Sequence, residues 1–347
     1  MLTNTEKHIK KNQKSTRIIL QKTNELIKNG NLPKRYRFPL NIQFEVTSKC
    51  NLACKHCYNR SGQHQKQPDI PFETLLKACR ELSSFGGLFQ ATISGGEPLL
   101  LGERLWDMLD ILHADGTIFN MITNGILFTA NTLEHLKKYR FYWVQISIDS
   151  YTPDDHDEFR GMKGGWEKAV KAAYSVALSG LPLRIASSIR PKHIGNIERF
   201  VKMAINLGAS YLVIGEIMPS GRAFDNPEIF LSPLDRDNFL KEIKSLSQKY
   251  RKEISILIGG TQRLQLEYAA AQSIDGAIVR PNGDVRLDCG CPFVIGNIAQ
   301  DNIVNIWARS QECWNHPLVK KYIESCDMET GESSFINNYC DDDIYLY

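Results

Sequence analysis

Residues 41–57 read NIQFEVTSKCNLACKHC, and this stretch decides the fold. Its first part, 42–46, is an apolar run typical of a strand, and Cys50, Cys54 and Cys57 follow with the spacing C-x3-C-x2-C. Cysteines at such close spacings ligate iron–sulfur clusters. Three thiolates on a four-iron cubane leave one iron open to a small molecule, and an open metal position marks a site that does chemistry.

A structural zinc ion is the alternative at this loop, with His56 or a distant cysteine as the fourth ligand. Three features favour the cluster. The motif directly follows the first predicted strand, His56 lies inside the spacing, and the run Ser94-Gly95-Gly96-Glu97-Pro98 follows the second predicted strand.

Composition excludes several classes of protein. The chain has 347 residues and a net charge of +3, from 42 basic and 39 acidic residues, which gives no reason to expect nucleic acid as a partner. No apolar run is long enough to span a bilayer, and the polar N-terminus lacks a signal peptide. We therefore expect a cytoplasmic protein without a membrane partner, whose nine cysteines are reduced and available for metals.

Short apolar strands alternate with amphipathic helices from residue 41 onward. The predicted strands are 41–47, 90–94, 117–122, 142–148, 183–189 and 211–217, and the predicted helices are 72–85, 103–114, 130–138, 166–179, 196–207 and 235–249. Six strand–helix pairs in succession predict an α/β fold with parallel strands, a partial (β/α)6 barrel of the TIM type. Polar or glycine-rich residues follow each predicted strand, which places one active-site mouth at the carboxyl ends of the strands.

Four segments are expected along the chain. Residues 1–40 form an N-terminal segment with a helix over 5–29, 41–250 the barrel, 251–275 a linker, and 276–347 a second module. This module opens with a β-hairpin around the turn Asn282-Gly283. It also holds five of the nine cysteines, which indicates a small metal-dependent domain.

These motifs resemble the radical S-adenosylmethionine (SAM) enzymes over residues 41–220. The three cysteines match that superfamily's C-x3-C-x-φ-C motif, with His56 at the φ position, and residues 95–98 match its Gly-Gly-Glu-Pro motif. The resemblance implies that Cys50, Cys54 and Cys57 hold a 4Fe-4S cluster whose open iron binds SAM. The reduced cluster then cleaves SAM to a 5′-deoxyadenosyl radical, which abstracts a substrate hydrogen.

The resemblance also implies a set of SAM contacts. They are His56, Ser94, Gly95, Gly96, Glu97, Asn124, Ser147, Asp149, Arg160 and Ser187. Glycine would let the backbone approach the methionine amino group, and the Arg160 fork would pair with a carboxylate. A capping aspartate, a surface arginine and an Asn-Gly turn remain the alternatives for Asp149, Arg160 and Asn124.

Further stretches are similar to radical SAM enzymes that modify ribosomally made peptides, including thioether-forming maturases. They are residues 144–149, 155–157, 160–165 and 219–223. The resemblance implies a thioether or carbon–carbon crosslink, or an epimerised α-carbon, in a peptide substrate. It also implies a low-potential electron donor such as flavodoxin or ferredoxin. Because the 40 residues before the barrel are too short for the usual leader-binding domain, a separate protein is one candidate for leader recognition.

The C-terminal module resembles the auxiliary-cluster extension of those enzymes, in the shorter "twitch" variant of the SPASM domain. Gly283, Cys289, residues 296–298 and residues 306–307 carry the likeness. The resemblance implies one auxiliary 4Fe-4S cluster on Cys289, Cys291, Cys326 and Cys340, with Cys313 as a core thiol. A zinc site or unligated thiols are the alternative. The rival functions are a formylglycine-forming sulfatase maturase, a small-molecule radical SAM dehydrogenase, and a non-enzymatic iron–sulfur or zinc scaffold protein.

Overall fold

The computed structural model describes residues 25–26, 28–31, 36–62, 68–258, 266–267, 269–270, 276–326 and 343–347. Most of the predicted N-terminal helix 5–29 and the predicted ligand Cys340 lie outside these residues. No helix among them is long and apolar enough to cross a membrane.

The described strands form a single curved sheet in the order β11-β10-β9-β8-β1-β2-β3-β4-β5-β6-β7. From β8 through β1 to β7, each strand runs parallel to the next one in this order. The parallel strands are β1 (Asn41–Glu45), β2 (Gln90–Ser94), β3 (Ile118–Thr123), β4 (Phe141–Ser147), β5 (Leu183–Ser188), β6 (Tyr211–Gly215), β7 (Ser255–Ile258) and β8 (Gly276–Val279). The parallel arrangement places the carboxyl ends of β1 to β6 at one edge.

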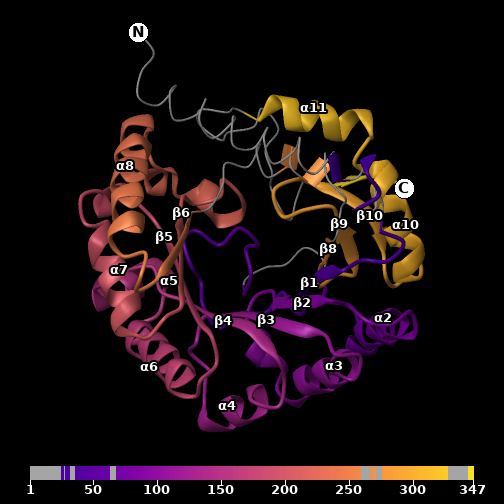
Figure 1. Ribbon diagram of the computed structural model, residues 1–347, viewed down its shortest axis with the longest axis horizontal. Helices are drawn as coiled ribbons and strands as arrows, with labels where there is room; N and C mark the ends of the chain where they lie inside the picture. Colours follow the sequence, from indigo (N-terminus) through magenta and orange to yellow (C-terminus); the bar gives the residue numbers. More distant parts are fainter. Residues whose placement is uncertain are drawn as a thin grey trace.

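Helices cover the outer face of this sheet (Figure 1). They are α2 (Phe72–Ser84), α3 (Glu103–His113), α4 (Ala130–Leu136), α6 (Gly165–Leu178), α7 (Ile197–Asn206) and α8 (Pro233–Lys249). Each begins near a strand's carboxyl end, so the chain returns along the outside of the sheet as a crossover connection requires. The short helix α5 (Pro153–Arg160) precedes α6 and lies at the carboxyl end of β4, where Arg160 pairs with Asp149.

Alternate residues of each strand point to opposite faces, and the two faces differ in chemistry. Apolar side chains such as Phe44, Ile93 and Ile185 are fully buried in the core beneath the helices. On the inner face, the Asn120 side-chain amide donates to the Thr92 hydroxyl at 3.1 Å. The apolar face therefore holds the barrel together, and the inner face is left with polar groups.

The C-terminal part continues the same sheet, because β8 pairs with β1 over residues 41–44. Strand β9 (Asp284–Arg286) is antiparallel to β8 and to β10 (Phe293–Asn297), and β11 (Ile344–Tyr345) is parallel to β10. Helices α10 (Ile303–Cys313) and α11 (Pro317–Ser325) lie beside this part of the sheet (Figure 1). The predicted hairpin is confirmed, with Gly283 at φ +88° in its turn.

The six predicted strands and six predicted helices are all present within three residues at either end. Two elements of the barrel were not predicted. Helix α5, sequence PDDHDEFR, has three buried residues and lacks a continuous apolar stripe. Strand β7 lies within 251–275, which was predicted as a linker, and three of its four residues are exposed. The sheet therefore has two more parallel strands than the predicted six, β7 beside β6 and β8 beside β1.

Candidate active site

The cysteine loop, residues 47–62, follows β1 directly and carries Cys50, Cys54 and Cys57. Cys54 is buried and the other two are half-buried. Burial raises the pKa of Cys50, and it raises the pKa of Cys54 to about 12, whereas the nearby Arg160 guanidinium lowers both. The two thiols also interact electrostatically with Cys57. The loop therefore gathers three thiols in one low-dielectric place, with a cation close to them.

The Gly-Gly-Glu run after β2 packs directly on the cysteine loop. The Gly96 amide donates to the Thr47 carbonyl at 2.7 Å, and the Glu97 amide donates to the Lys49 carbonyl at 2.9 Å. A Cβ on Gly96 would lie 2.1 Å from the Lys49 oxygen, and one on Gly95 would lie 2.7 Å from the Thr47 oxygen. The glycines are thus required by the contact between two loops, a role that the sequence analysis did not predict.

Glu97 is a buried anchor between the ends of β2 and β3. Its carboxylate accepts from the Thr123 hydroxyl at 2.7 Å and from the Asn124 amide at 2.9 Å. Burial raises its pKa, and these hydrogen bonds oppose the rise. The Asn124 side chain continues the chain of contacts and donates to the Asn51 side-chain oxygen at 2.8 Å. The third strand end is therefore tied to the cysteine loop.

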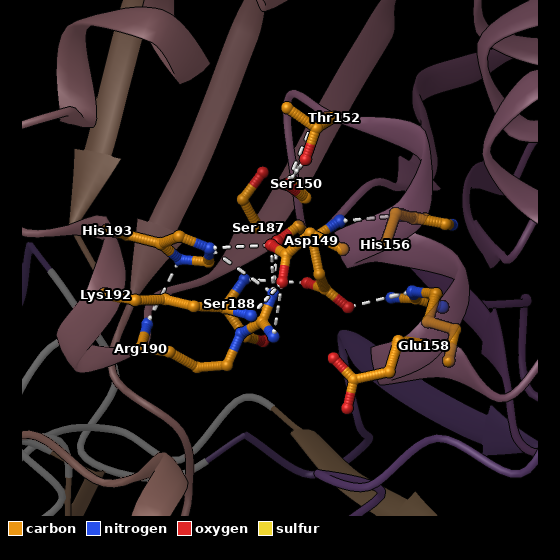
Figure 2. Close-up of polar contacts among 12 residues, drawn as sticks. Asp149, Ser150, Thr152, His156, Glu158, Ser187, Ser188, Arg190, Lys192 and His193 are labelled. Atoms are coloured by element: carbon orange, nitrogen blue, oxygen red, sulfur yellow. Dashed lines mark hydrogen bonds and ion pairs between the residues drawn. The ribbon is translucent and has the colours of Figure 1, made fainter.

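Asp149, which lies beside Ser188 in Figure 2, forms a buried ion pair with Arg160 at the end of β4. The Arg160 Nε lies 2.8 Å from Asp149 Oδ2, and Asp149 Oδ1 accepts from the Ser188 amide at 2.8 Å. Burial alone would raise the pKa of Asp149, but Arg160 and His56 lower it well below its usual range. Both residues are thus buried members of the site, not a surface arginine and a simple cap.

His56, inside the cysteine loop, contacts this ion pair. Its Nε2 lies 3.4 Å from Asp149 Oδ2, and its ring stacks on Phe159 with 4.5 Å between centroids. Burial lowers the pKa of His56 to about 4, so the ring is neutral at pH 7. A neutral ring stacked on an aromatic ring resembles an aromatic φ residue more than a metal ligand.

The three predicted serines have different surroundings. The Ser187 hydroxyl donates to the Ile148 carbonyl at 2.5 Å, so it joins β5 to β4 (Figure 2). The Ser94 hydroxyl is buried without a hydrogen-bond partner among the described residues, and Ser147 is half-buried. Of the three, Ser94 has the donor most clearly left for a ligand.

The most extensive contact to the cysteine loop comes from Arg222, which the sequence analysis did not select. Its Nε donates to the Cys54 carbonyl and its guanidinium to the Ser61 carbonyl, both at 2.9 Å, and its amide donates to the Cys57 carbonyl at 2.9 Å. It lies in the 3-10 turn η3 (Gly221–Asp225) after β6. The sequence pointed to this residue only indirectly, because residues 219–223 are one of the stretches that resemble peptide-modifying radical SAM enzymes.

A second group that was not predicted lies beside the ion pair, on the far side of Phe159. The Arg190 guanidinium lies 3.8 Å from the Phe159 ring centroid, opposite an Asp155 carboxylate whose Oδ2 is 2.8 Å away. The same carboxylate oxygen lies 3.0 Å from His193 Nε2. This group fixes α5 against the end of β5, and α5 carries Arg160.

The C-terminal cysteines that the structure describes lie on the β9–β10 connection and at the end of α11. Burial raises the pKa of Cys289, and it raises the pKa of Cys291 to about 12. Cys326 is fully buried, and the Tyr322 hydroxyl donates to the Gly290 carbonyl at 3.0 Å, which holds α11 against that connection. Cys313 is buried at the end of α10, as expected of a core thiol.

Among the described residues, no three His, Cys, Asp or Glu side chains are arranged to hold a single metal ion. A cubane does not need such an arrangement, because each thiolate binds a different iron. The cysteine loop fits this group: it presents three thiols, the Arg160 cation of α5 lies near them, and the buried Ser94 hydroxyl stands at the end of β2 beside the start of the loop. The zinc alternative with His56 as the fourth ligand fits less well, because His56 faces Asp149.

Comparison with known proteins gives the loop a family context. Residues 44–208 match the Radical SAM superfamily. The chain is 31% identical to the PqqA peptide cyclase of Ruegeria pomeroyi over 54% of this chain and 50% of that protein. It is 28% identical to the antilisterial bacteriocin subtilosin biosynthesis protein AlbA of Bacillus subtilis, over 82% of this chain and 62% of that protein.

The fold also matches solved structures. Streptococcus suis SuiB bound to S-adenosylmethionine superposes with a TM-score of 0.65 over 97% of this chain and 84% of SuiB, at 15% identity. SuiB bound to its precursor peptide SuiA gives a TM-score of 0.63 over 92% of this chain and 79% of SuiB. At these identities the likeness is one of fold. The chain spans about half to three fifths of the length of the sequence relatives named above.

Proposed function

Since residues 44–208 form a radical SAM domain, we propose that this protein binds a 4Fe-4S cluster on Cys50, Cys54 and Cys57 and cleaves SAM to modify a peptide. The observation that carries the proposal is the cysteine loop itself. Three thiols of that domain are held together by backbone and side-chain bonds from the ends of β2, β3 and β6. When bound, the cluster supplies the electron that breaks the sulfonium of SAM and produces a 5′-deoxyadenosyl radical.

The chain's own residues bind the cluster and SAM and hold them in position. The Arg160 cation favours the thiolate forms of Cys50 and Cys54 that iron binds. The Ser94 hydroxyl and the parts of Arg160 not used by Asp149 are the groups we assign to SAM. We assign His56 to a stacking contact, because its ring is neutral and already parallel to Phe159. Glu97, Ser187 and Asp149 position these groups through their hydrogen bonds.

A peptide is the substrate class with most support. The PqqA peptide cyclase and the subtilosin biosynthesis protein are sequence relatives of this chain, and SuiB shares its fold. The inner face of the sheet is lined by polar groups, which suits a chain with many backbone donors and acceptors. A crosslink or an epimerised α-carbon is the product we propose.

An auxiliary cluster on Cys289, Cys291, Cys326 and Cys340 belongs to the same proposal. The first three lie where β9, β10 and α11 meet, and Arg286, with a fully buried side chain, is close enough to lower the pKa of Cys289 and Cys291. A flavodoxin or ferredoxin as electron donor, a separate leader-recognition protein and a cytoplasmic location are the remaining parts of the proposal.

The test uses anaerobically reconstituted protein with dithionite and SAM. We expect 5′-deoxyadenosine, and with peptides encoded beside this reading frame we expect either loss of two hydrogen atoms or deuterium uptake from heavy water. The first product would be a crosslink and the second an epimer. Intact SAM under these conditions would contradict the proposal. Cleavage of SAM without any change in the peptides would support the first part of the proposal, SAM cleavage, and contradict the second, modification of these peptides.

A further inference from the structure

Arg184 lies on the inner face of β5, in the polar interior of the barrel. Its partners in the sheet register are Gln145 on β4 and Tyr211 on β6, so these three side chains share a face. Its neighbours along the strand, Leu183 and Ile185, are buried on the opposite face beneath the helices. Arg184 therefore points to the side of the sheet where a substrate is expected.

The guanidinium of Arg184 rests on the indole of Trp143, with 4.0 Å from Cζ to the ring centroid. Trp143 is buried, so the ring forms a fixed flat support beneath the cation. A guanidinium held flat in this way presents its N–H groups in one plane, which is the geometry that binds a carboxylate with two hydrogen bonds.

Within the described part of the chain, Arg184 has neither an ion pair nor a hydrogen bond, and its Nε is buried without an acceptor. Burial is the only influence on its pKa, which it lowers to about 10, so the side chain keeps its charge at pH 7. The neighbouring Gln145 side-chain oxygen is also buried without a partner. A half-buried charge without a counter-ion has lost part of its contact with water, and an anionic ligand would offset that loss.

Other buried arginines of the barrel differ in this respect. Arg160 has the Asp149 carboxylate at 2.8 Å. Arg190 has the Asp155 carboxylate at 2.8 Å. Both of these arginines are thus matched by a carboxylate of the chain itself, whereas Arg184 has no such carboxylate among the described residues.

The distance from the mouth identifies which part of a substrate Arg184 would meet. Ser188, on the same face of β5, donates its amide to Asp149 at the mouth. Arg184 lies four residues before it, roughly 13 Å along the strand at ~3.3 Å per residue. An extended peptide covers that distance in about four residues, so the group at Arg184 is remote from the reacting carbon.

We propose that Arg184, supported by Trp143, binds a carboxylate of the substrate about four residues from the reacting position. This inference rests on the proposed function, because it takes a peptide as the occupant of the barrel. The carboxylate is either an acidic side chain or the C-terminus of the peptide. Binding energy from this remote contact orients the reacting residue at the mouth.

Selection from pools of short N-acetylated peptides tests the proposal. Three pools are compared by mass spectrometry after equilibrium binding: one with Asp or Glu and an amidated C-terminus, one with Asn or Gln in their place, and one with a free C-terminal carboxylate. We expect at least a tenfold preference for one carboxylate pool over the neutral pool. The preferred pool identifies the source of the carboxylate.

Arg184→Met should abolish this preference, and Arg184→Lys should keep part of it because the charge remains. Arg199→Met is the matched control, since Arg199 lies over the Tyr151 ring at 5.2 Å on helix α7. It should keep the preference. The melting temperature of ligand-free Arg184→Met should equal or exceed that of the parent protein, because the variant removes a half-buried charge that has no counter-ion among the described residues.

Equal binding of the three pools by the parent protein would overturn the inference, and so would a carboxylate preference that survives in Arg184→Met. A large fall in the melting temperature of Arg184→Met would also contradict it, because a carboxylate of the chain itself would then be the partner. Failure of the proposed function is separate, since SAM cleavage without peptide does not involve Arg184.

Discussion

The two cysteine-bearing regions of this protein are held in different ways. The loop of Cys50, Cys54 and Cys57 is bound by groups from the ends of β2, β3 and β6 and by the Asp149–Arg160 pair. Cys289, Cys291 and Cys326 lie on the β9–β10 connection and at the end of α11, which a hydrogen bond from the Tyr322 hydroxyl to the Gly290 carbonyl joins. Groups of the barrel shape the first site, whereas the second includes a predicted ligand, Cys340, that lies outside the described residues.

This difference predicts that changes around the first loop cost stability in the metal-free protein, and that changes in the second region mainly cost iron. Asp149→Asn should have the largest effect. It should lower the free energy of unfolding of the metal-free protein by about 3–5 kcal/mol, because it leaves the Arg160 cation buried and unpaired. Denaturant unfolding measures this.

The pH dependence of that loss follows from the pKa of Asp149, which is lowered in the folded state. Its contribution is complete above the unfolded pKa of about 3.9 and is lost as the pH falls through the lower folded pKa. The gap between the parent and Asp149→Asn should be constant from pH 6 to 8 and shrink below about pH 4. Asp225→Asn is the control, because it breaks an exposed ion pair with Arg60. It should lower the free energy of unfolding by under about 1 kcal/mol.

Gly96→Ala should have the next largest effect. It should lower the free energy of unfolding by about 3 kcal/mol, because the new Cβ would meet the Lys49 carbonyl at 2.1 Å. Gly116→Ala is the control, since Gly116 has φ +80° and open space around it. It should cost about 1 kcal/mol from backbone strain alone. Equal losses in the two variants would show that the contact between the two loops does not constrain the site.

Arg222→Met should lower the unfolding free energy by about 2 kcal/mol and reduce iron loading, because it frees the carbonyls of Cys54 and Ser61. Arg80→Met, on the exposed surface of α2, should change the unfolding free energy by under about 0.5 kcal/mol. Full iron loading of Arg222→Met would mean that the loop keeps its shape without this residue.

The smallest effect on folding should come from the C-terminal cysteines. Cys291→Ala should cost about 1 kcal/mol in the metal-free protein, since it removes one small buried group. The same variant should lose the iron of the auxiliary cluster, ~four atoms per chain. Cys313→Ala, another buried thiol, should keep that iron. Loss of iron in Cys313→Ala would place a ligand where we expect a core thiol.

The barrel could be predicted because apolar periodicity records which face of each strand and helix is buried. Helix α5 was not predicted because its sequence has no apolar stripe. Its charged residues Asp155, Asp157 and Arg160 hold it in place through hydrogen bonds and ion pairs instead. Strand β7 was missed because three of its four residues are exposed.

The cysteine loop and the Gly-Gly-Glu run could likewise be predicted, since the chemistry of their residues is local. The role of Arg222 could not, because it depends on a contact between residues more than 160 positions apart. The sequence also could not predict that Arg184 has no carboxylate partner among the described residues, because that depends on the folded structure.

The most direct test of the account compares SAM cleavage, without peptide, in two multiple variants under dithionite. Cys50, Cys54 and Cys57 are changed to Ala in one, and Cys291 and Cys326 in the other. The account predicts that the first forms no 5′-deoxyadenosine and that the second forms it at a rate close to that of the parent protein. Continued cleavage by the first variant would contradict the account.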